Sequence, residues 1–175
     1  MGYEYSRQPQ TKAKLIFKRR ELLYDAENYS FVEGDIMKTD NEHERHQVFD
    51  IGEHGNVNRV TRVLNLAYSE CVEMLYPYTK EEVPEEQEDL NDVLEVPEEY
   101  IIELTLPNGF SISTVKLLKH LIHEYLVCMV LADWMSIVNK GSQANWEDKI
   151  MRLKTKIQTS LVSRRGKIRR TLKPF

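Results

Sequence analysis

The stretch from Ser113 to about Val138 constrains the fold most, because its apolar residues follow a helical spacing on two faces. One face carries Val115, Leu118, Ile122, Tyr125, Met129 and Ala132. The second carries Leu117, Leu121, Cys128, Leu131 and Met135. A helix that is apolar on two sides normally lies between neighbours that cover both. The sequence therefore predicts a central helix, with Ser113 as its N-cap.

Two further segments predict helices that pack on this central one. Residues 57–76 place a single apolar stripe on one face, and Pro77 ends the pattern because proline lacks the backbone N–H. Residues 142–162 form a second amphipathic helix, which Ser142 caps. The expected core is therefore a three-helix antiparallel bundle. Its predicted members are Val60, Leu64, Cys71, Leu118, Leu121, Tyr125, Cys128, Leu131, Trp134, Trp146, Leu153 and Ile157.

The remaining segments predict shorter elements. Ala13–Phe17 fits an edge strand or the start of a helix, and Tyr100–Leu106 fits a strand stopped by a Pro-Asn-Gly turn. From Arg19 the spacing is helical up to a stop at Gly34, although residues 29–32 also fit a strand. Residues 41–51 fit a short helix ended by Gly52. We therefore expect one predominantly helical α+β domain over residues 1–175, with extra short helices and a few short strands.

Acidic and basic residues occupy separate parts of the chain, which a net charge of −4 conceals. Residues 149–175 contain ten Lys or Arg and no Asp or Glu, whereas residues 81–103 contain eleven Asp or Glu and no Lys or Arg. Residues 80–99 are predicted to form an acidic loop, because their apolar surface is too small to offset the entropy of ordering. Such segregation favours a chain that docks charge against charge, on a partner or on copies of itself.

The N-terminal and cysteine patterns bear on where the chain is found. Residues 1–12 are polar and expected to be mobile, and they contain no apolar core of a secretory leader. The longest apolar run, residues 126–132, is too short to span a bilayer. Cys71 and Cys128 fall in apolar helical patterns and are predicted to be buried reduced thiols. We therefore expect a protein that is cytoplasmic when made, without a membrane partner.

The sequence offers little that favours catalysis. It contains no nucleophile elbow, phosphate-binding loop or dinucleotide fingerprint. His120 and His123 look like part of a zinc-protease motif, but position 127, where that motif needs a histidine, is Val127. His43, His46 and Asp50 would share a helix face, which leaves a divalent-metal site open as an alternative. We expect no enzymatic activity, no cofactor and no small-molecule substrate.

The basic C-terminal segment, residues 164–175, is the strongest candidate site. Guanidinium groups pair well with carboxylates and phosphates, and apolar residues alternate with them here. The residues expected to contact a partner are Arg164, Arg165, Lys167, Ile168, Arg169, Arg170, Leu172 and Phe175. The partner would be a second copy, whose acidic loop offers the opposite charge, or another protein. The alternative is a nucleic-acid-binding module that uses the same residues on phosphates.

Three segments carry a resemblance to a known group of proteins. They are residues 46–78, which include Gly55-Asn56-Val57-Asn58-Arg59; residues 123–134, which end in Ala132-Asp133-Trp134; and Arg169-Arg170-Thr171-Leu172-Lys173-Pro174-Phe175. Together they resemble uncharacterised prophage proteins of gut bacteria encoded among virion structural genes. Such proteins are similar to the small helical connectors of the neck between a portal ring and a tail. The resemblance implies a ring-forming virion component without enzymatic activity, which associates with itself or with other virion proteins and ends up in the virion.

Overall fold

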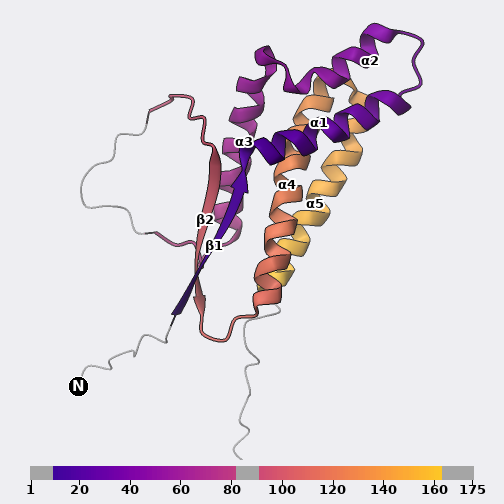
Figure 1. The fold of residues 1–175 in the computed structure, drawn as a ribbon. Helices are drawn as coiled ribbons and strands as arrows, with labels where there is room; N and C mark the ends of the chain where they lie inside the picture. Colours follow the sequence, from indigo (N-terminus) through magenta and orange to yellow (C-terminus); the bar gives the residue numbers. More distant parts are fainter. Residues whose placement is uncertain (1–9, 82–90, 163–175) are drawn as a thin grey trace, which may run out of the picture.

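The computed structural model describes residues 10–81 and 91–162. Within these ranges the chain forms five α-helices and one two-stranded antiparallel sheet, so the predicted α+β, predominantly helical class is confirmed. Figure 1 shows the strands on one side of the helices, with α1 and α2 at the upper end of the bundle. The lower end is formed by the first half of α4 and the second half of α5, beside the lower ends of the two strands.

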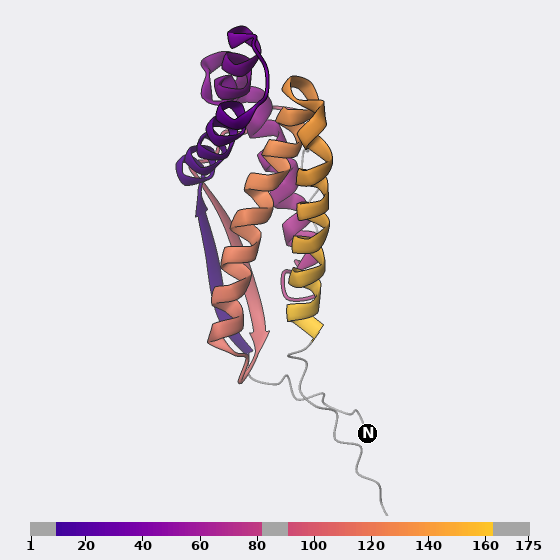
Figure 2. The same ribbon diagram turned by 90° about the vertical axis from the view of Figure 1, so that its right-hand side faces the viewer.

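The central element is α4 (Ile112–Val138), as the two-sided apolar pattern predicts. It packs against α3 (His54–Met74) and runs antiparallel to α5 (Lys140–Val162), as Figures 1 and 2 show. All predicted core residues are buried except Leu121, which is only partly buried. Assigning Leu121 to the core was therefore wrong, because no neighbour among the described residues covers that side of α4 completely.

The helix expected from Arg19 to a stop at Gly34 is present as α1 (Arg19–Ile36), which runs two residues further and packs against α4. Gly34 does not end it. A Cβ atom at Gly34 would lie 2.2 Å from the Phe49 ring, so glycine is needed there for close packing. Residues 42–49 form α2 (Glu42–Phe49), which Asn41 caps and a 3-10 turn, η1 (Asp50–Gly52), follows. The predicted short helix ended by Gly52 thus divides into two pieces.

The two predicted strands pair with each other. β1 (Gln10–Lys18) and β2 (Glu99–Pro107) are antiparallel, with Ile16 opposite Ile101. β1 begins inside the stretch 1–12 that was expected to be mobile. Alternate residues of each strand point to the helices, as expected for a sheet with one buried face. The buried side chains are Leu15, Phe17, Tyr100, Ile102, Leu104 and Leu106.

The helix starts lie earlier than the capping residues predict. Ser111, not Ser113, precedes α4, and Ser142 lies inside the first turn of α5, which begins at Lys140. The turn between these two helices needs only Asn139, whose N–H donates to the Met135 carbonyl at 2.9 Å. This tight turn aligns α4 and α5 along their whole lengths.

Helix α4 is long and apolar enough, by length and composition, to cross a membrane. However, 56% of its most apolar window is buried by the rest of the fold. That burial is the property of a central helix in a packed domain, which passes the same test of length and composition.

Candidate interaction site

The predicted partner-binding segment cannot be placed. Arg164, Arg165, Lys167, Ile168, Arg169, Arg170, Leu172 and Phe175 lie outside the described residues.

The acidic loop is described only in part. Residues 82–90 lie outside the structure, and residues 91–98 form neither helix nor strand. On α3, the Asn65 side-chain amide donates to the Glu95 carbonyl at 2.9 Å, and Arg62 lies 3.6 Å from the Asp92 carboxylate. This portion of the acidic segment is therefore held against α3.

A cluster of charged and aromatic side chains joins α1, α4 and α5. The Tyr29 hydroxyl of α1 donates to Glu124 of α4 at 3.0 Å, and Lys149 of α5 binds the same carboxylate. The Tyr29 ring meets Trp146 edge to face at 5.4 Å, and the Trp146 N–H donates to Glu33 at 2.6 Å. We call this cluster the upper clamp. It ties α1 across the groove between α4 and α5.

The electrostatics of the upper clamp indicate a structural role. Burial and the hydrogen bond to Glu124 raise the pKa of Tyr29. Burial alone would lower the pKa of Lys149, but the Glu124 carboxylate outweighs it and the pKa is raised. Near neutral pH the tyrosine therefore stays neutral and the lysine stays charged. Neither group has the pKa of a general base that works at neutral pH.

The candidate histidines make ordinary contacts. His123 lies 2.7 Å from the Asp25 carboxylate of α1, an ordinary contact between two packed helices. His43 contacts Gln47, and His46 lies beside the Phe49 ring. Among residues 10–81 and 91–162, no three His, Cys, Asp or Glu side chains come together as metal ligands. The alternative metal site at His43, His46 and Asp50 therefore lacks geometric support in the described part of the chain.

Both thiols are free and buried, as predicted. Burial raises the pKa of Cys71 beyond its usual range and that of Cys128 to about 12. A nucleophilic cysteine needs a lowered pKa, so neither is activated.

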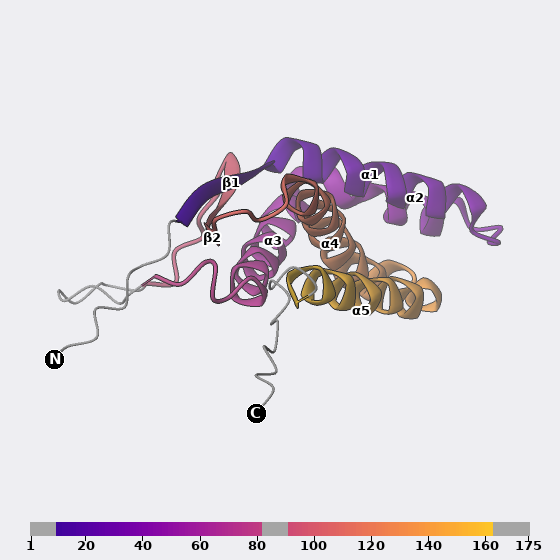
Figure 3. The ribbon, with the colours of Figure 1, turned by 90° about the horizontal axis from the view of Figure 1, so that it is seen from below.

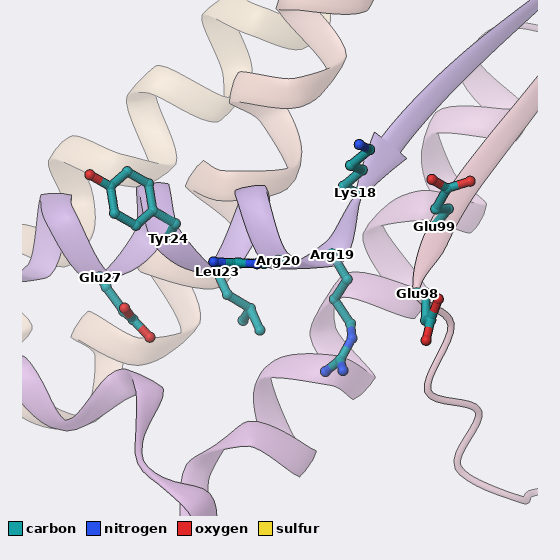
Figure 4. A pocket seen from close by; sticks show the side chains of 8 residues that line it. All are labelled: Lys18, Arg19, Arg20, Leu23, Tyr24, Glu27, Glu98 and Glu99. Atoms are coloured by element: carbon teal, nitrogen blue, oxygen red, sulfur yellow. The ribbon is translucent and has the colours of Figure 1, made fainter.

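The largest described cavity, about 640 Å³, lies where β1 passes into α1. Figure 4 shows that its side chains point in different directions, with Arg19 directed away from Tyr24 and Lys18. Three cations and three carboxylates share the lining. A small-molecule site normally has an apolar cavity with a few convergent polar groups, and this cavity lacks that convergence.

A second hollow has a different character. It lies between the first half of α4 and the second half of α5, measures about 450 Å³, and is lined by Leu117, Leu121, Thr155, Lys156, Thr159 and Ser160. We call it the lower groove. Leu117 is 48% exposed, so an apolar side chain faces solvent there. The same two helices carry both features, with Lys149 of α5 in the upper clamp and Lys156 of α5 in the lower groove. Figure 2 shows α4 and α5 running alongside each other between these two levels.

The outer surface of α1 exposes apolar side chains beside carboxylates. Tyr24, Phe31, Val32 and Ile36 are between 56% and 71% exposed. The Phe31 ring stacks on Phe49 of α2 at 5.2 Å, which holds it in place. Residues 21–36 contain five Asp or Glu and no Lys or Arg. We call this the outer face of α1.

The charges of the described elements divide between two ends of the bundle. Residues 21–53, at the upper end, contain ten Asp or Glu and two Lys or Arg. Residues 112–123 of α4 and 149–162 of α5, which flank the lower groove, contain six Lys or Arg and no Asp or Glu. Figure 3, a view from below, shows α4 and α5 side by side at this end. These two parts of the fold thus carry opposite charges.

The sequence analysis missed the residues of both surfaces. It assigned Leu117 and Leu121 to an inner stripe of the central helix, and it did not single out Tyr24 or Phe31. The signal that could have found them is the lack of acids in residues 112–123 and of bases in residues 21–36.

Comparison of the chain with family models, curated proteins and solved structures gave no match.

Proposed function

We propose that this protein is a non-enzymatic assembly component that associates with copies of itself, or with other proteins of the same particle, through oppositely charged surfaces. The observation that carries the proposal is the separation of charge between the two ends of the fold. Exposed apolar side chains accompany the charges at both ends. Charge complementarity steers association, while apolar burial supplies most of the affinity.

The two surfaces are different, which determines the kind of assembly. A contact between the acidic end of one copy and the basic end of the next is heterologous, and each copy keeps one free surface of each kind. Repetition closes such contacts into a ring or extends them into a filament. A ring agrees with the resemblance to connector and neck proteins of phage particles. We therefore propose a structural role in a phage-like particle.

The basic segment beyond α5 belongs to the same proposal. Residues 164–175 continue from the basic end of the bundle and add six Lys or Arg to it. They would extend the cationic surface, and Ile168, Leu172 and Phe175 would supply apolar contacts. A protein partner with a carboxylate-rich surface fits this composition.

Sedimentation velocity over a range of protein and salt concentrations tests the proposal. We expect concentration-dependent species larger than a monomer, which weaken as salt screens the charges. Replacing Arg164, Arg165, Lys167, Arg169 and Arg170 by glutamine should weaken the association. Electron micrographs of a concentrated sample should show rings or short filaments.

Two results would contradict the proposal. A chain that stays monomeric at the highest concentration and binds no structural protein of its own particle would overturn the proposal. Steep salt-dependent retardation of duplex DNA, lost in the glutamine variant, would instead favour the nucleic-acid-binding alternative.

A further inference from the structure

We propose that the lower groove binds the outer face of α1 from a second copy. This inference rests on the proposed self-association and names the two surfaces that meet. Among the described residues, the groove is the place where α4 and α5 leave leucine side chains open between them.

The upper half of the same groove shows what α4 and α5 accept. There the protein's own α1 contributes an aromatic ring and a carboxylate, as Tyr29 packs on Trp146 and Glu33 accepts the Trp146 N–H. Lys149 adds a cation over both rings, 4.9 Å from the Tyr29 centroid and 5.3 Å from that of Trp146. The groove thus already receives an aromatic and acidic helix face along part of its length.

The lower half of the groove offers the same two features, an apolar floor and a lysine beside it. Leu117 and Leu121 form an apolar floor, and Lys156 lines the groove two turns beyond Lys149 on the same side of α5. Thr155 and Thr159 complete the wall with small side chains, which leaves room for a ring. An incoming segment therefore needs exposed aromatic side chains with carboxylates beside them.

The outer face of α1 meets this requirement. Tyr24 is 59% exposed and Phe31 60% exposed, and Glu27 and Asp35 are exposed beside them on the same face. Of the five carboxylates of residues 21–36, Asp25 and Glu33 already bind His123 and Trp146 in the same molecule, so Glu21, Glu27 and Asp35 would face the groove of a neighbour. Lys149 is likewise bound to Glu124, which leaves the other five cations of residues 112–123 and 149–162 to meet them. Because α1 of the same molecule directs its other face to α4, its outer face remains available to a neighbour.

Two other segments of the chain fit less well. Residues 163–175 carry six Lys or Arg and no acid, so the lysines that flank the groove repel them. Residues 81–98 have the matching charge but contain no aromatic residue. The outer face of α1 is the part of the described chain that combines both features.

Paired variants test the contact. Leu117→Asp places a carboxylate on the groove floor, and Phe31→Lys places a cation on the outer face of α1. Tyr24→Lys is a second variant of that face, because Phe31 also stacks on Phe49 and its loss could disturb α2. Leu66→Asp and Leu66→Lys are matched controls, since Leu66 is 60% exposed on α3, away from both surfaces. Circular dichroism and urea unfolding confirm that each variant folds.

Sedimentation velocity of the variants, alone and mixed, gives the decisive result. We expect Leu117→Asp, Phe31→Lys and Tyr24→Lys each to weaken association at least tenfold, and the Leu66 variants to behave as the parent. An equimolar mixture of Leu117→Asp with Tyr24→Lys or Phe31→Lys should form dimers and nothing larger. Each variant keeps one intact surface, so a head-to-tail contact can form once and cannot continue.

The other outcomes separate this inference from the proposed function. A parent chain that never associates overturns both. Association of the parent with no effect of the three variants leaves the proposed function standing and overturns this contact. A defect in Leu117→Asp alone means that the groove receives another part of the second copy, such as the acidic segment. Failure of the mixture to form dimers when each variant is defective means that the contact is not head-to-tail.

Discussion

The upper and lower halves of the groove between α4 and α5 are lined by the same two helices, yet one is closed and the other open. In the upper half, Tyr29 and Glu33 of α1 meet Trp146, and Glu124 binds both Tyr29 and Lys149. In the lower half, Leu117 remains 48% exposed between the two helices. The difference shows that the apolar surface of α4 extends beyond the part that α1 buries.

Length and direction explain why the cover is incomplete. At 1.5 Å per residue, α4 with its 27 residues is about 40 Å long and α1 with its 18 residues about 27 Å. Helix α1 also crosses α4 at its upper part and does not run along it, as Figures 1 and 2 show. It therefore covers one half of the groove and leaves the other half open.

Trp146→Ala should have the largest effect, because it removes the residue on which the upper clamp is built. Trp146 is 8% exposed, packs against Tyr29 and binds Glu33. Truncation of a buried tryptophan lowers the free energy of unfolding by about 3–5 kcal/mol. Urea unfolding followed by circular dichroism measures it.

Leu117→Ala is the matched variant of the open half. We expect it to lower the free energy of unfolding by less than about 1 kcal/mol, since its side chain is half exposed and alanine favours helix. Equal losses of stability in the two variants would contradict the contrast between the halves.

Glu33→Ala should have an intermediate effect. Its Oε1 accepts the Trp146 N–H at 2.6 Å, so truncation leaves a nearly buried donor without its partner. Such a loss costs about 1–3 kcal/mol. The other oxygen, Oε2, is buried without a partner in the described part of the chain, and removing it offsets some of the loss. We expect a net loss of about 1 kcal/mol in urea unfolding.

Glu27→Ala is the control for Glu33→Ala, because it removes an exposed carboxylate from the same helix. Its effect should stay within about 0.5 kcal/mol. If Glu33→Ala is equally silent, the bond to Trp146 does not help to hold α1 over the groove.

The closed half could be predicted from sequence only in part. Periodicity located α4, the inner face of α5 and the burial of Trp146, because apolar spacing reports which face of a helix is covered. Periodicity could not identify which element covers that face. Tyr29 and Trp146 lie more than 100 positions apart, and no local pattern links them. The packing role of Gly34 was also missed, because a glycine after a helical pattern predicts a stop, whereas Gly34 lies inside α1 in close contact with Phe49.

The open half was missed for the opposite reason. The second apolar stripe of α4 predicted cover along its whole length, and the stripe does include Leu117 and Leu121. The structure shows that the stripe continues beyond the part of α4 that α1 covers, so that Leu117 and Leu121 line an open groove. An apolar stripe that is buried within the fold and one that is exposed have the same residue spacing. The charges beside Leu117, which are all positive, distinguish them only once α5 is known to lie alongside.

Alkaline pH should weaken the upper clamp. The pKa values of Tyr29 and Lys149 are raised in the folded protein, so the folded state holds protons that the unfolded state has lost. Their stabilising contribution is therefore complete below about pH 10 and is lost as pH rises through the folded pKa values. Urea unfolding between pH 8 and 11 should show a falling free energy of unfolding.

A Tyr29→Phe variant isolates the clamp from the other buried tyrosines and thiols, whose raised pKa values act in the same direction. The variant should show a shallower fall with pH than the parent. Identical slopes would mean that the ionisation of Tyr29 contributes nothing to the alkaline loss of stability.

Lys156→Gln should have the smallest effect on stability and still weaken association. Lys156 is exposed on the wall of the lower groove, and substitutions of this kind change the free energy of unfolding by no more than about 0.5 kcal/mol. If the groove receives a carboxylate-rich face, removing one cation should weaken association several-fold at low salt. The difference from the parent should vanish near 1 M salt, where screening acts within about 3 Å.

Lys140→Gln, at the opposite end of α5, changes net charge equally and serves as the control. Because both variants lose one exposed lysine of α5 and only Lys156 lines the lower groove, an equal loss of association would assign the effect to net charge and not to the open half.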